Sequence, residues 1–226
     1  MNKASRDLLV YALKIGALSL YPDPAAQRKL NSGRMSPYFF NSGMFANGEA
    51  LSTLIAAYIA AGEKLKYGCI FGPAYKGITL AAAMSAELWS HHGISVGFAF
   101  NRKEAKDHGE GGLLVGAEKM RGKRVLITDD VMITGDSKME ALKLITEAGG
   151  VPAGCLIAFD REETAKDGDA LTARETFVGA TGLEVHAATS VTDLQELLFE
   201  GGHPDADAVL PLLDRYLITY GARGLA

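Results

Sequence analysis

Residues 124–137 read RVLITDDVMITGDS, and this stretch indicates most strongly how the chain folds. It opens with a short apolar run at 125–127, which has the length and the β-branched content of a buried strand. The adjacent carboxylates Asp129 and Asp130 follow, and small and hydroxylated residues come next. Residues 137–140 (SKME) have the spacing of a capping box, which predicts that a helix begins there.

The helix predicted after this loop has an inward stripe of Met139, Leu142 and Ile145, and Gly149–Gly150 would end it with a left-handed cap. A strand, an acidic pair, a loop and a helix N-terminus in this order can hold a phosphorylated sugar. Unpaired N–H groups at a helix start attract phosphate, and Gly135 lets the main chain approach it closely. The carboxylates can accept hydrogen bonds from sugar hydroxyls or help hold a divalent metal. The alternative is a strand that simply ends in a capped turn.

The composition is that of an ordinary globular protein. The chain has 226 residues, of which 48% are hydrophobic and 22% are charged, and no linker divides it. We therefore expect one domain spanning residues 1–226. The net charge of −4 does not indicate a basic surface of the kind that binds nucleic acid, so we expect no nucleic-acid partner.

The chain has no apolar run of the roughly 18 residues that a membrane span requires, so we expect no membrane partner. Charged residues interrupt the apolar pattern of the N-terminus, unlike in a signal peptide. Cys69 and Cys155 lie in apolar runs and are expected to be small buried residues of a reducing compartment. These features predict a cytoplasmic protein.

Strand and helix patterns alternate along the chain, which favours an α/β fold with a parallel sheet covered by helices on both faces. Ligands bind beyond the carboxyl ends of the strands in such sheets. Three loops with unusual residues are expected at that edge, at 72–77, 101–112 and 129–137, and their convergence is the main reason to expect a site. Helices are expected at 5–18, 48–66, 78–91, from 192 and at 206–220, and strands at 69–71, 94–100, 125–127, 151–159 and 185–188.

Residues 30–44 could form a pair of short strands with an aromatic tip at Tyr38, Phe39 and Phe40, or these rings could simply pack in the core. Residues 101–112 (NRKEAKDHGEGG) gather cations before a run of glycines. Such a loop could be merely solvated. Beside a phosphate site, however, a glycine-hinged cationic segment can close over a polyphosphate, so we expect a lid that is mobile without ligand. The cations are Arg102, Lys103, Lys106 and His108.

Several of these motifs resemble a known family. The stretch DDVMITG at 129–135 looks like the phosphoribosyl-pyrophosphate (PRPP) binding motif of type I phosphoribosyltransferases. Together, SGRMSPYFFNSG, FGPAYKG, NRKEAKDHGEGG and FDREE resemble orotate phosphoribosyltransferases, in the same order and at similar spacing over most of residues 31–163. The resemblance implies the type I phosphoribosyltransferase fold, with a mostly parallel sheet flanked by helices and a small hood built from about residues 1–45.

The resemblance also implies a reaction in which orotate and PRPP give orotidine 5′-monophosphate and pyrophosphate, in pyrimidine (UMP) synthesis. Mg²⁺ would be the cofactor, held mainly by PRPP and water. The enzyme would be a homodimer whose lid reaches the neighbouring active site. Breaking the bond from C1′ to pyrophosphate builds positive charge on the sugar and negative charge on the leaving group, so cations placed beforehand are suited to the chemistry.

The same resemblance assigns roles to individual residues. Lys103, Asp129 and Asp130 would be the catalytic residues, with the two carboxylates on the ribose hydroxyls. Phe39, Phe40, Ile133 and Arg161 would contact orotate. PRPP would be bound by Tyr75, Lys76, Arg102, Lys103, Lys106, His108, Asp129 and Asp130, and its 5′-phosphate by Val131, Met132, Ile133, Thr134, Gly135, Asp136 and Ser137.

Three positions depart from the family pattern. Asn31 stands where the family commonly has a lysine, and Lys29 lies two residues earlier. Ile133 stands where a threonine is usual near the base, and Asp136 where a small hydroxylated residue is usual beside the phosphate. Two alternatives share the fold: a phosphoribosyltransferase for another nucleobase, and a PRPP-sensing regulator that binds nucleic acid.

Overall fold

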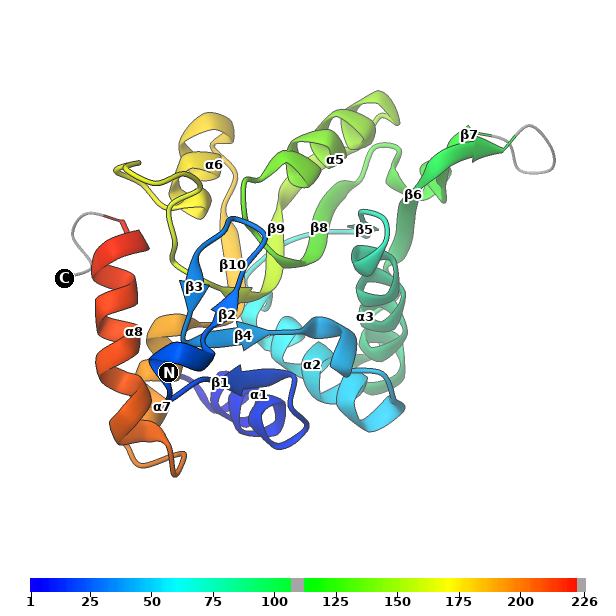
Figure 1. Ribbon diagram of the computed structural model, residues 1–226. Coiled ribbons are helices and arrows are strands. Elements are labelled where there is room, and N and C mark those ends of the chain that lie inside the picture. Colours follow the sequence, from blue (N-terminus) through cyan, green and yellow to red (C-terminus); the bar gives the residue numbers. More distant parts are fainter. Residues whose placement is uncertain (107–111, 223–226) are drawn as a thin grey trace.

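A six-stranded sheet forms the centre of the molecule (Figure 1), in the order β10-β9-β8-β5-β6-β7. The computed structural model describes residues 1–106 and 112–222, apart from the side chains of residues 105, 106 and 112. Every neighbouring pair is parallel except β6 and β7. The predicted mostly parallel α/β architecture is therefore confirmed. The strands are β5 (Cys69–Gly72), β6 (Gly97–Lys106), β7 (Gly112–Val115), β8 (Arg124–Val131), β9 (Val151–Asp160) and β10 (Val185–Ser190).

Helices cover both faces of this sheet because alternate strand residues point to opposite sides. Leu126 of β8 belongs to a core shared with helices α1, α2, α3, α7 and α8, whereas Val125 and Ile127 belong to a second core shared with α4, α5 and α6. The helices are α1 (Lys3–Lys14), α2 (Gly48–Ala61), α3 (Lys76–His92), α4 (Ala117–Met120), α5 (Asp136–Glu147), α6 (Ala173–Thr181), α7 (Val191–Phe199) and α8 (Ala206–Tyr220).

The N-terminal segment forms two small antiparallel pairs, which lie against the central sheet near α8 in Figure 1. Strand β4 (Tyr38–Phe40) pairs with β1 (Leu18–Leu20), and β3 (Met35–Ser36) pairs with β2 (Arg28–Lys29). The prediction that residues 30–44 pair with each other is therefore wrong, because both of their strands find earlier partners. Short 3₁₀ turns at Pro24–Ala26 and Ser42–Met44 complete the segment.

Some helix boundaries differ from those predicted, and local capping explains the differences. Helix α2 ends at Ala61 with Gly62 as its C-cap, five residues before the predicted end at 66. Ser190 caps α7 and exchanges hydrogen bonds with Asp193, so the helix begins at Val191, one residue before the start predicted at 192. Helix α8 has the predicted bounds, 206–220, and Pro211 lies inside it.

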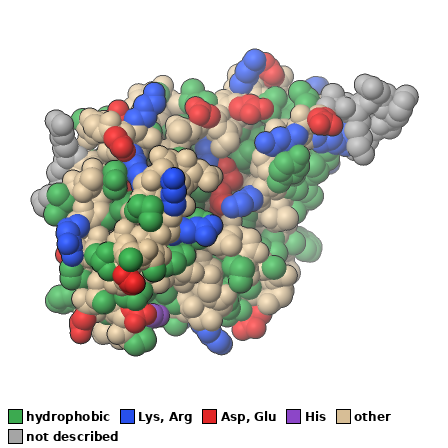
Figure 2. Space-filling model, in the orientation of Figure 1, with side chains coloured by type: hydrophobic (Ala, Val, Ile, Leu, Met, Phe, Trp, Pro, Cys, Tyr) green, Lys and Arg blue, Asp and Glu red, His purple; other side chains and the backbone are tan. Residues whose placement is uncertain are grey.

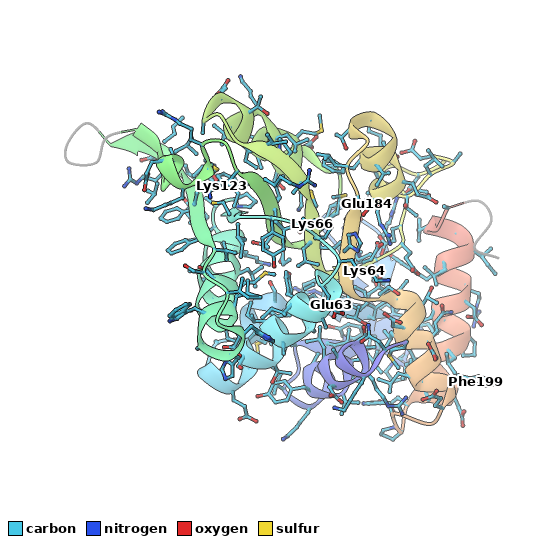
Figure 3. The ribbon with its side chains drawn as sticks, turned by 180° about the vertical axis from the view of Figure 1, so that it is seen from behind. Glu63, Lys64, Lys66, Lys123, Glu184 and Phe199 are labelled. Atoms are coloured by element: carbon cyan, nitrogen blue, oxygen red, sulfur yellow. The ribbon has the colours of Figure 1, made fainter. Side chains whose placement is uncertain are left out.

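Exposed charged residues precede the strands at the amino end of the sheet. Figure 3, seen from behind, labels three of them: Lys66 before β5, Lys123 before β8 and Glu184 before β10. The carboxyl ends of the same strands therefore lie at the opposite edge, next to the N-terminal strand pairs. Within the described ranges, no helix combines the length and apolar character required to cross a bilayer.

Candidate active site

Two of the predicted loops, 72–77 and 129–137, border a cavity of about 240 Å³ at the carboxyl end of β8. Asp129 and Asp130 lie at the end of this strand, between its parallel neighbours β5 and β9. Figure 2 shows acidic side chains in a hollow on this face with basic side chains around it. The cavity is lined by Arg28, Lys29, Leu30, Asn31, Ser32, Arg34, Phe39, Phe40, Lys76, Asp130, Val131, Met132, Ile133, Arg161, Glu163, Thr164 and Ala165.

Asp130 faces this cavity and is held by three donors. Lys76 Nζ lies 2.5 Å from its Oδ2, and Ser42 Oγ donates to the same oxygen at 2.8 Å. The backbone N–H of Val131 donates to Oδ1 at 2.9 Å. Lys76 comes from the start of α3 and Ser42 from the N-terminal segment, so one carboxylate links three parts of the chain.

Asp129 is paired with a different lysine. Lys138 Nζ lies 2.5 Å from its Oδ2 and also donates to the carbonyl of Val131 at 2.6 Å. The backbone N–H of Asp130 donates to Oδ1 of Asp129 at 3.0 Å. Tyr58 Oη donates to the main-chain carbonyl of Asp129 at 2.7 Å, and burial raises the pKa of Tyr58, which keeps this donor protonated.

Lys138 was missed in the sequence because a lysine is rarely buried unless it is paired. The inward face of α5 consists of Lys138, Ala141 and Ile145, whereas Met139 is 47% exposed. The predicted stripe is thus right at Ile145 and wrong at Met139. The signal that could have found Lys138 is its helical spacing from Ile145, seven residues later.

The turn into α5 leaves backbone donors available for an anion. Gly135 is the N-cap, with a left-handed φ of 87°, and it has no side chain with which to cap the helix. The predicted capping box at 137–140 is therefore wrong, since the helix begins at Asp136. The carboxylate of Asp136 is exposed and accepts a hydrogen bond from Thr134 Oγ1 at 2.7 Å. N–H groups of an uncapped first turn are suited to binding phosphate.

A second hollow, of about 260 Å³, lies between the β5–α3 turn, β6 and the start of α5. Tyr75 and Lys76 are exposed at the start of α3, and Lys103 Nζ lies 5.4 Å from the ring centroid of Tyr75. Asn101 Oδ1 accepts a hydrogen bond from the N–H of Ala74, which joins the turn to β6. The peptide bond between Ala74 and Tyr75 is cis. Pro73, Arg102, Lys103, Leu113, Ser137 and Glu140 are among the lining residues.

The β5–α3 turn depends on two glycines. A Cβ on Gly72 would lie 2.0 Å from the carbonyl oxygen of Gly77, and a Cβ on Gly77 would lie 2.7 Å from that of Thr128. Main chain therefore packs directly on main chain, which brings the start of α3 close to the end of β8.

The tip of the predicted lid lies outside the described residues. The antiparallel strands β6 and β7 project from the body of the molecule (Figure 1). Lys106 ends β6, but its side chain is not described, and His108 falls within the undescribed range 107–111. Of the predicted lid cations, the structure therefore brings Arg102 and Lys103 to the second hollow.

The two aromatic residues predicted to contact a base differ in their surroundings. The ring of Phe40 is buried and stacks on Phe159 at a centroid distance of 5.2 Å. The ring of Phe39 is half-buried, with the guanidinium of Arg28 at 5.0 Å. Both residues line the first cavity, together with Ile133. Phe39 thus offers the more accessible of the two rings.

Arg161 is anchored at the same end of the cavity. Its guanidinium lies 2.6 Å from Glu163 Oε1 and 4.9 Å from the ring centroid of Tyr38. Burial disfavours the charged guanidinium, but Tyr38 and Glu163 outweigh this effect and raise the pKa of Arg161 above its ordinary value. Arg34 Nη1 donates to Glu163 Oε2 at 3.1 Å and to the carbonyl of Thr164 at 3.0 Å. Sequence reasoning gave no role to Arg34, Ser42 or Glu163, although each lies in a quoted motif.

The donor set suits a magnesium ion that arrives with its ligand. In residues 1–106 and 112–222, no three His, Cys, Asp or Glu side chains lie together as a metal cage would require. The site instead offers the carboxylate of Asp130 in the first cavity, with Asp129 next to it at the end of β8, and cations line both hollows. Mg²⁺ keeps several waters and takes phosphate oxygens with one or two carboxylates, so these residues fit it.

Comparison with known proteins identifies the class. A family model described as the phosphoribosyl transferase domain matches residues 47–188. The chain is 47% identical over 201 residues to a protein of Stenotrophomonas maltophilia named orotate phosphoribosyltransferase, covering 88% of this chain and 90% of that protein. A protein of the same name from Xanthomonas euvesicatoria is 44% identical over 194 residues, covering 85% and 87%.

Solved structures agree with these relatives. The crystal structure of orotate phosphoribosyltransferase from Francisella tularensis has a TM-score of 0.81 at 34% identity, covering 95% of this chain and 98% of that one. The Mycobacterium tuberculosis enzyme in complex with PRPP has a TM-score of 0.61 at 20% identity, covering 84% and 98%, and shares the fold. The chain belongs to the phosphoribosyltransferase family, and within it to the orotate phosphoribosyltransferases.

Proposed function

We propose that this enzyme transfers ribose 5-phosphate from PRPP to orotate in a magnesium-dependent reaction. The observation that carries the proposal is the convergence of the acidic pair, an uncapped helix N-terminus and the Tyr75–Lys103 cluster at one sheet edge. In the reaction, a ring nitrogen of orotate forms a bond to C1′ while the bond from C1′ to the pyrophosphate oxygen breaks. Pyrophosphate leaves with the electron pair of that bond.

The residues have separate tasks in this reaction. The backbone from Val131 to Ser137 binds the 5′-phosphate, and the carboxyl end of β8, which carries the acidic pair, holds the ribose. Tyr75, Lys76, Arg102 and Lys103 face the diphosphate, and Lys106 and His108 complete this set from the lid. Cations fixed before the reaction stabilise the charge that develops on the leaving group. Mg²⁺, when bound with PRPP near Asp129 and Asp130, supplies further neutralisation of the diphosphate.

The base binds at the opposite end of the first cavity, between Phe39 and Arg161. An aromatic ring offers a flat wall to a pyrimidine, and a guanidinium fork matches a carboxylate. Ile133 and the backbone around Phe40 close this end. Lys29 and Asn31 both line the cavity, so Lys29 is positioned to supply the cation that the family commonly has at position 31.

We also propose a homodimer in which the lid reaches the neighbouring site. Trp89, Ile94 and Phe98 are exposed at the end of α3 and the start of β6, and exposed apolar patches of this kind mark interfaces. Sedimentation equilibrium is expected to give twice the mass of one chain, and Trp89→Glu is expected to shift it towards one chain. A wild-type protein of single-chain mass that retains full turnover would contradict this part of the proposal.

The activity is tested by the ultraviolet absorbance of orotate. We expect absorbance loss that requires both PRPP and Mg²⁺, stops on addition of EDTA and resumes when excess Mg²⁺ is restored. Uracil, adenine, guanine and hypoxanthine serve as the comparison panel. Turnover of one of these bases in preference to orotate would indicate another nucleobase enzyme, and retention of DNA or RNA at physiological salt without turnover would indicate a regulator.

The cellular role follows from the same chemistry. We place the enzyme in de novo pyrimidine (UMP) synthesis in the cytoplasm, with residues 1–226 acting as one domain whose hood is built from about residues 1–45. Expression in a uracil auxotroph that lacks orotate phosphoribosyltransferase is expected to restore growth. A single calorimetric unfolding transition is expected for one domain.

A further inference from the structure

The lysines paired with Asp129 and Asp130 differ in how far they are exposed to solvent. Lys138, on Asp129, has a side chain that is only 4% exposed, whereas Lys76, on Asp130, is 57% exposed. Both carboxylates are nearly buried, at 13% and 12%. One ion pair is therefore sealed beneath α5, and the other opens to the cavity.

Both carboxylate oxygens of Asp129 accept hydrogen bonds from the protein. Oδ2 accepts from Lys138 at 2.5 Å and from Ser137 Oγ at 3.3 Å, while Oδ1 accepts from the N–H of Asp130. A buried ammonium cannot leave such a carboxylate without becoming an unpaired buried charge itself. A sugar hydroxyl would have to compete with this contact in order to bind Asp129.

Lys138 also fixes the main chain of the phosphate-binding turn. Its ammonium donates to the carbonyl of Val131 at 2.6 Å, so one side chain ties the first turn of α5 to the last residue of β8. The intervening residues 132–137 are thereby closed into a loop whose two ends are joined. A loop preformed in this way loses less conformational entropy when it binds phosphate.

We propose that Lys138 is a positioning residue that makes the two aspartates unequal. Asp129, locked to Lys138, shapes the 5′-phosphate loop, and Asp130 alone meets the ribose hydroxyls after Lys76 turns towards the diphosphate. This inference rests on the proposed function and departs from the equal roles that the family resemblance assigns to the pair.

The test is a set of double-mutant cycles read out as the KM for PRPP. Lys138→Met keeps the side-chain length and removes the ammonium, and it is expected to raise this KM about 10-fold with less than about a 3-fold change in the KM for orotate. Asp129→Asn is expected to raise the KM for PRPP about 10-fold. The double variant Asp129→Asn, Lys138→Met is expected to raise it by about the same 10-fold, since the two residues act as one unit. Asp130→Asn is expected to lower kcat/KM at least about 100-fold and to add its full effect to that of Lys138→Met.

Lys143→Met is the matched control. Lys143 lies on the same helix, is 76% exposed and approaches Glu147 only to 3.9 Å, so its loss is expected to change neither KM. A merely structural Lys138 would lower Tm and leave the KM for PRPP unchanged, and that outcome would overturn the proposal. Equal losses for Asp129→Asn and Asp130→Asn would also overturn it, and this comparison needs no Lys138 variant to fold.

Calorimetric titration of the wild-type enzyme with PRPP and Mg²⁺ separates this inference from the proposed function. No binding to the wild type would refute the function itself. Binding to the wild type with the same Kd in Lys138→Met would refute only the role of Lys138.

Discussion

The guanidinium of Arg161 is bound to Glu163, only two residues later in the chain, and this pairing fixes its orientation at the base end of the cavity. The second oxygen of Glu163 accepts from Arg34, which belongs to the N-terminal segment. A single carboxylate, whose side chain is 10% exposed, thus aligns one arginine for the proposed base site and joins it to the N-terminal segment.

Replacing this carboxylate is expected to weaken both stability and base binding. Glu163→Gln removes the charge shared by Arg34 and Arg161, and we expect the free energy of unfolding to fall by about 1.5 to 3 kcal/mol. The KM for orotate is expected to rise about 10-fold because Arg161 loses its fixed orientation. Chemical denaturation and steady-state kinetics measure the two effects.

Asp167→Asn is the control for Glu163→Gln. Asp167 also pairs with Arg34, but its side chain is 72% exposed, so its loss is expected to cost less than about 1 kcal/mol. An equal cost for both variants would show that burial of the carboxylate is not what matters.

Lys103 is expected to act on the leaving group. Lys103→Ala removes the cation that lies over the ring of Tyr75, and we expect kcat/KM to fall at least about 100-fold, because charge on the departing diphosphate is less well compensated. Tm is expected to stay within about 2 °C of the wild type, since the side chain is exposed. Lys119→Ala, an exposed lysine of α4, is the control, and near-wild-type turnover in Lys103→Ala would remove the role assigned to this residue.

The glycine contact between β5 and α3 predicts a steric effect. Gly77→Ala places a Cβ 2.7 Å from the carbonyl of Thr128, so we expect the free energy of unfolding to fall by about 2 to 3 kcal/mol. Gly179→Ala is the matched substitution. Gly179 lies within α6, and apart from the backbone of its own helix no heavy atom lies within 4 Å of an added Cβ, so alanine there is expected to be neutral or to stabilise by up to about 1 kcal/mol. Thermal unfolding of the two variants side by side decides the point.

The two cysteines are expected to be unreactive in the folded enzyme. Burial raises the pKa of Cys69 to about 11 and that of Cys155 to about 12. At pH 8, a thiol with a pKa of about 11 is ionised in about one molecule in a thousand, so Ellman's reagent is expected to react slowly with the native protein and to titrate both thiols in guanidinium. Fast modification of the native enzyme would contradict this assignment.

The same pKa shifts set the direction of one pH effect. The folded state holds each thiol proton more tightly than the unfolded state does. Keeping the Cys69 thiol protonated therefore leaves the free energy of unfolding at its full value below about pH 9. Part of that free energy is lost as the pH rises through about 11, because the unfolded state ionises first. Denaturation curves at pH 8 and pH 10.5 are expected to differ less in Cys69→Ala than in the wild type.

The sheet and the location of the site could be predicted from the sequence because their signals are local. The apolar run at 125–127, the acidic pair and the glycine-rich turn are contiguous, and the carboxyl-edge rule brings the separate loops together. What the sequence missed depends on distant partners. Lys138 reads as a surface residue until Asp129 is seen beneath it, and Arg34 gains its role only from Glu163 and Thr164.

The pairing of the strands in the N-terminal segment was predicted wrongly because it too depends on partners elsewhere in the chain. Strand β4 pairs with β1 across the intervening β2–β3 pair, and two- or three-residue strands carry no periodic signal of their own. The start of α5 was also predicted wrongly, because the helix is preceded by Gly135 in a left-handed conformation and not by a residue with a capping side chain.

The contacts of Arg34 have a consequence for biosynthesis. Its guanidinium binds Glu163 and Thr164 and lies 4.7 Å from the ring centroid of Tyr220. Tyr220 belongs to α8 and follows Arg34 in the chain, so the contacts of Arg34 can be completed only after α8 has been translated. A nascent chain in which α8 is not yet translated is therefore expected to form the turn into α5 before it can close the base end of the first cavity.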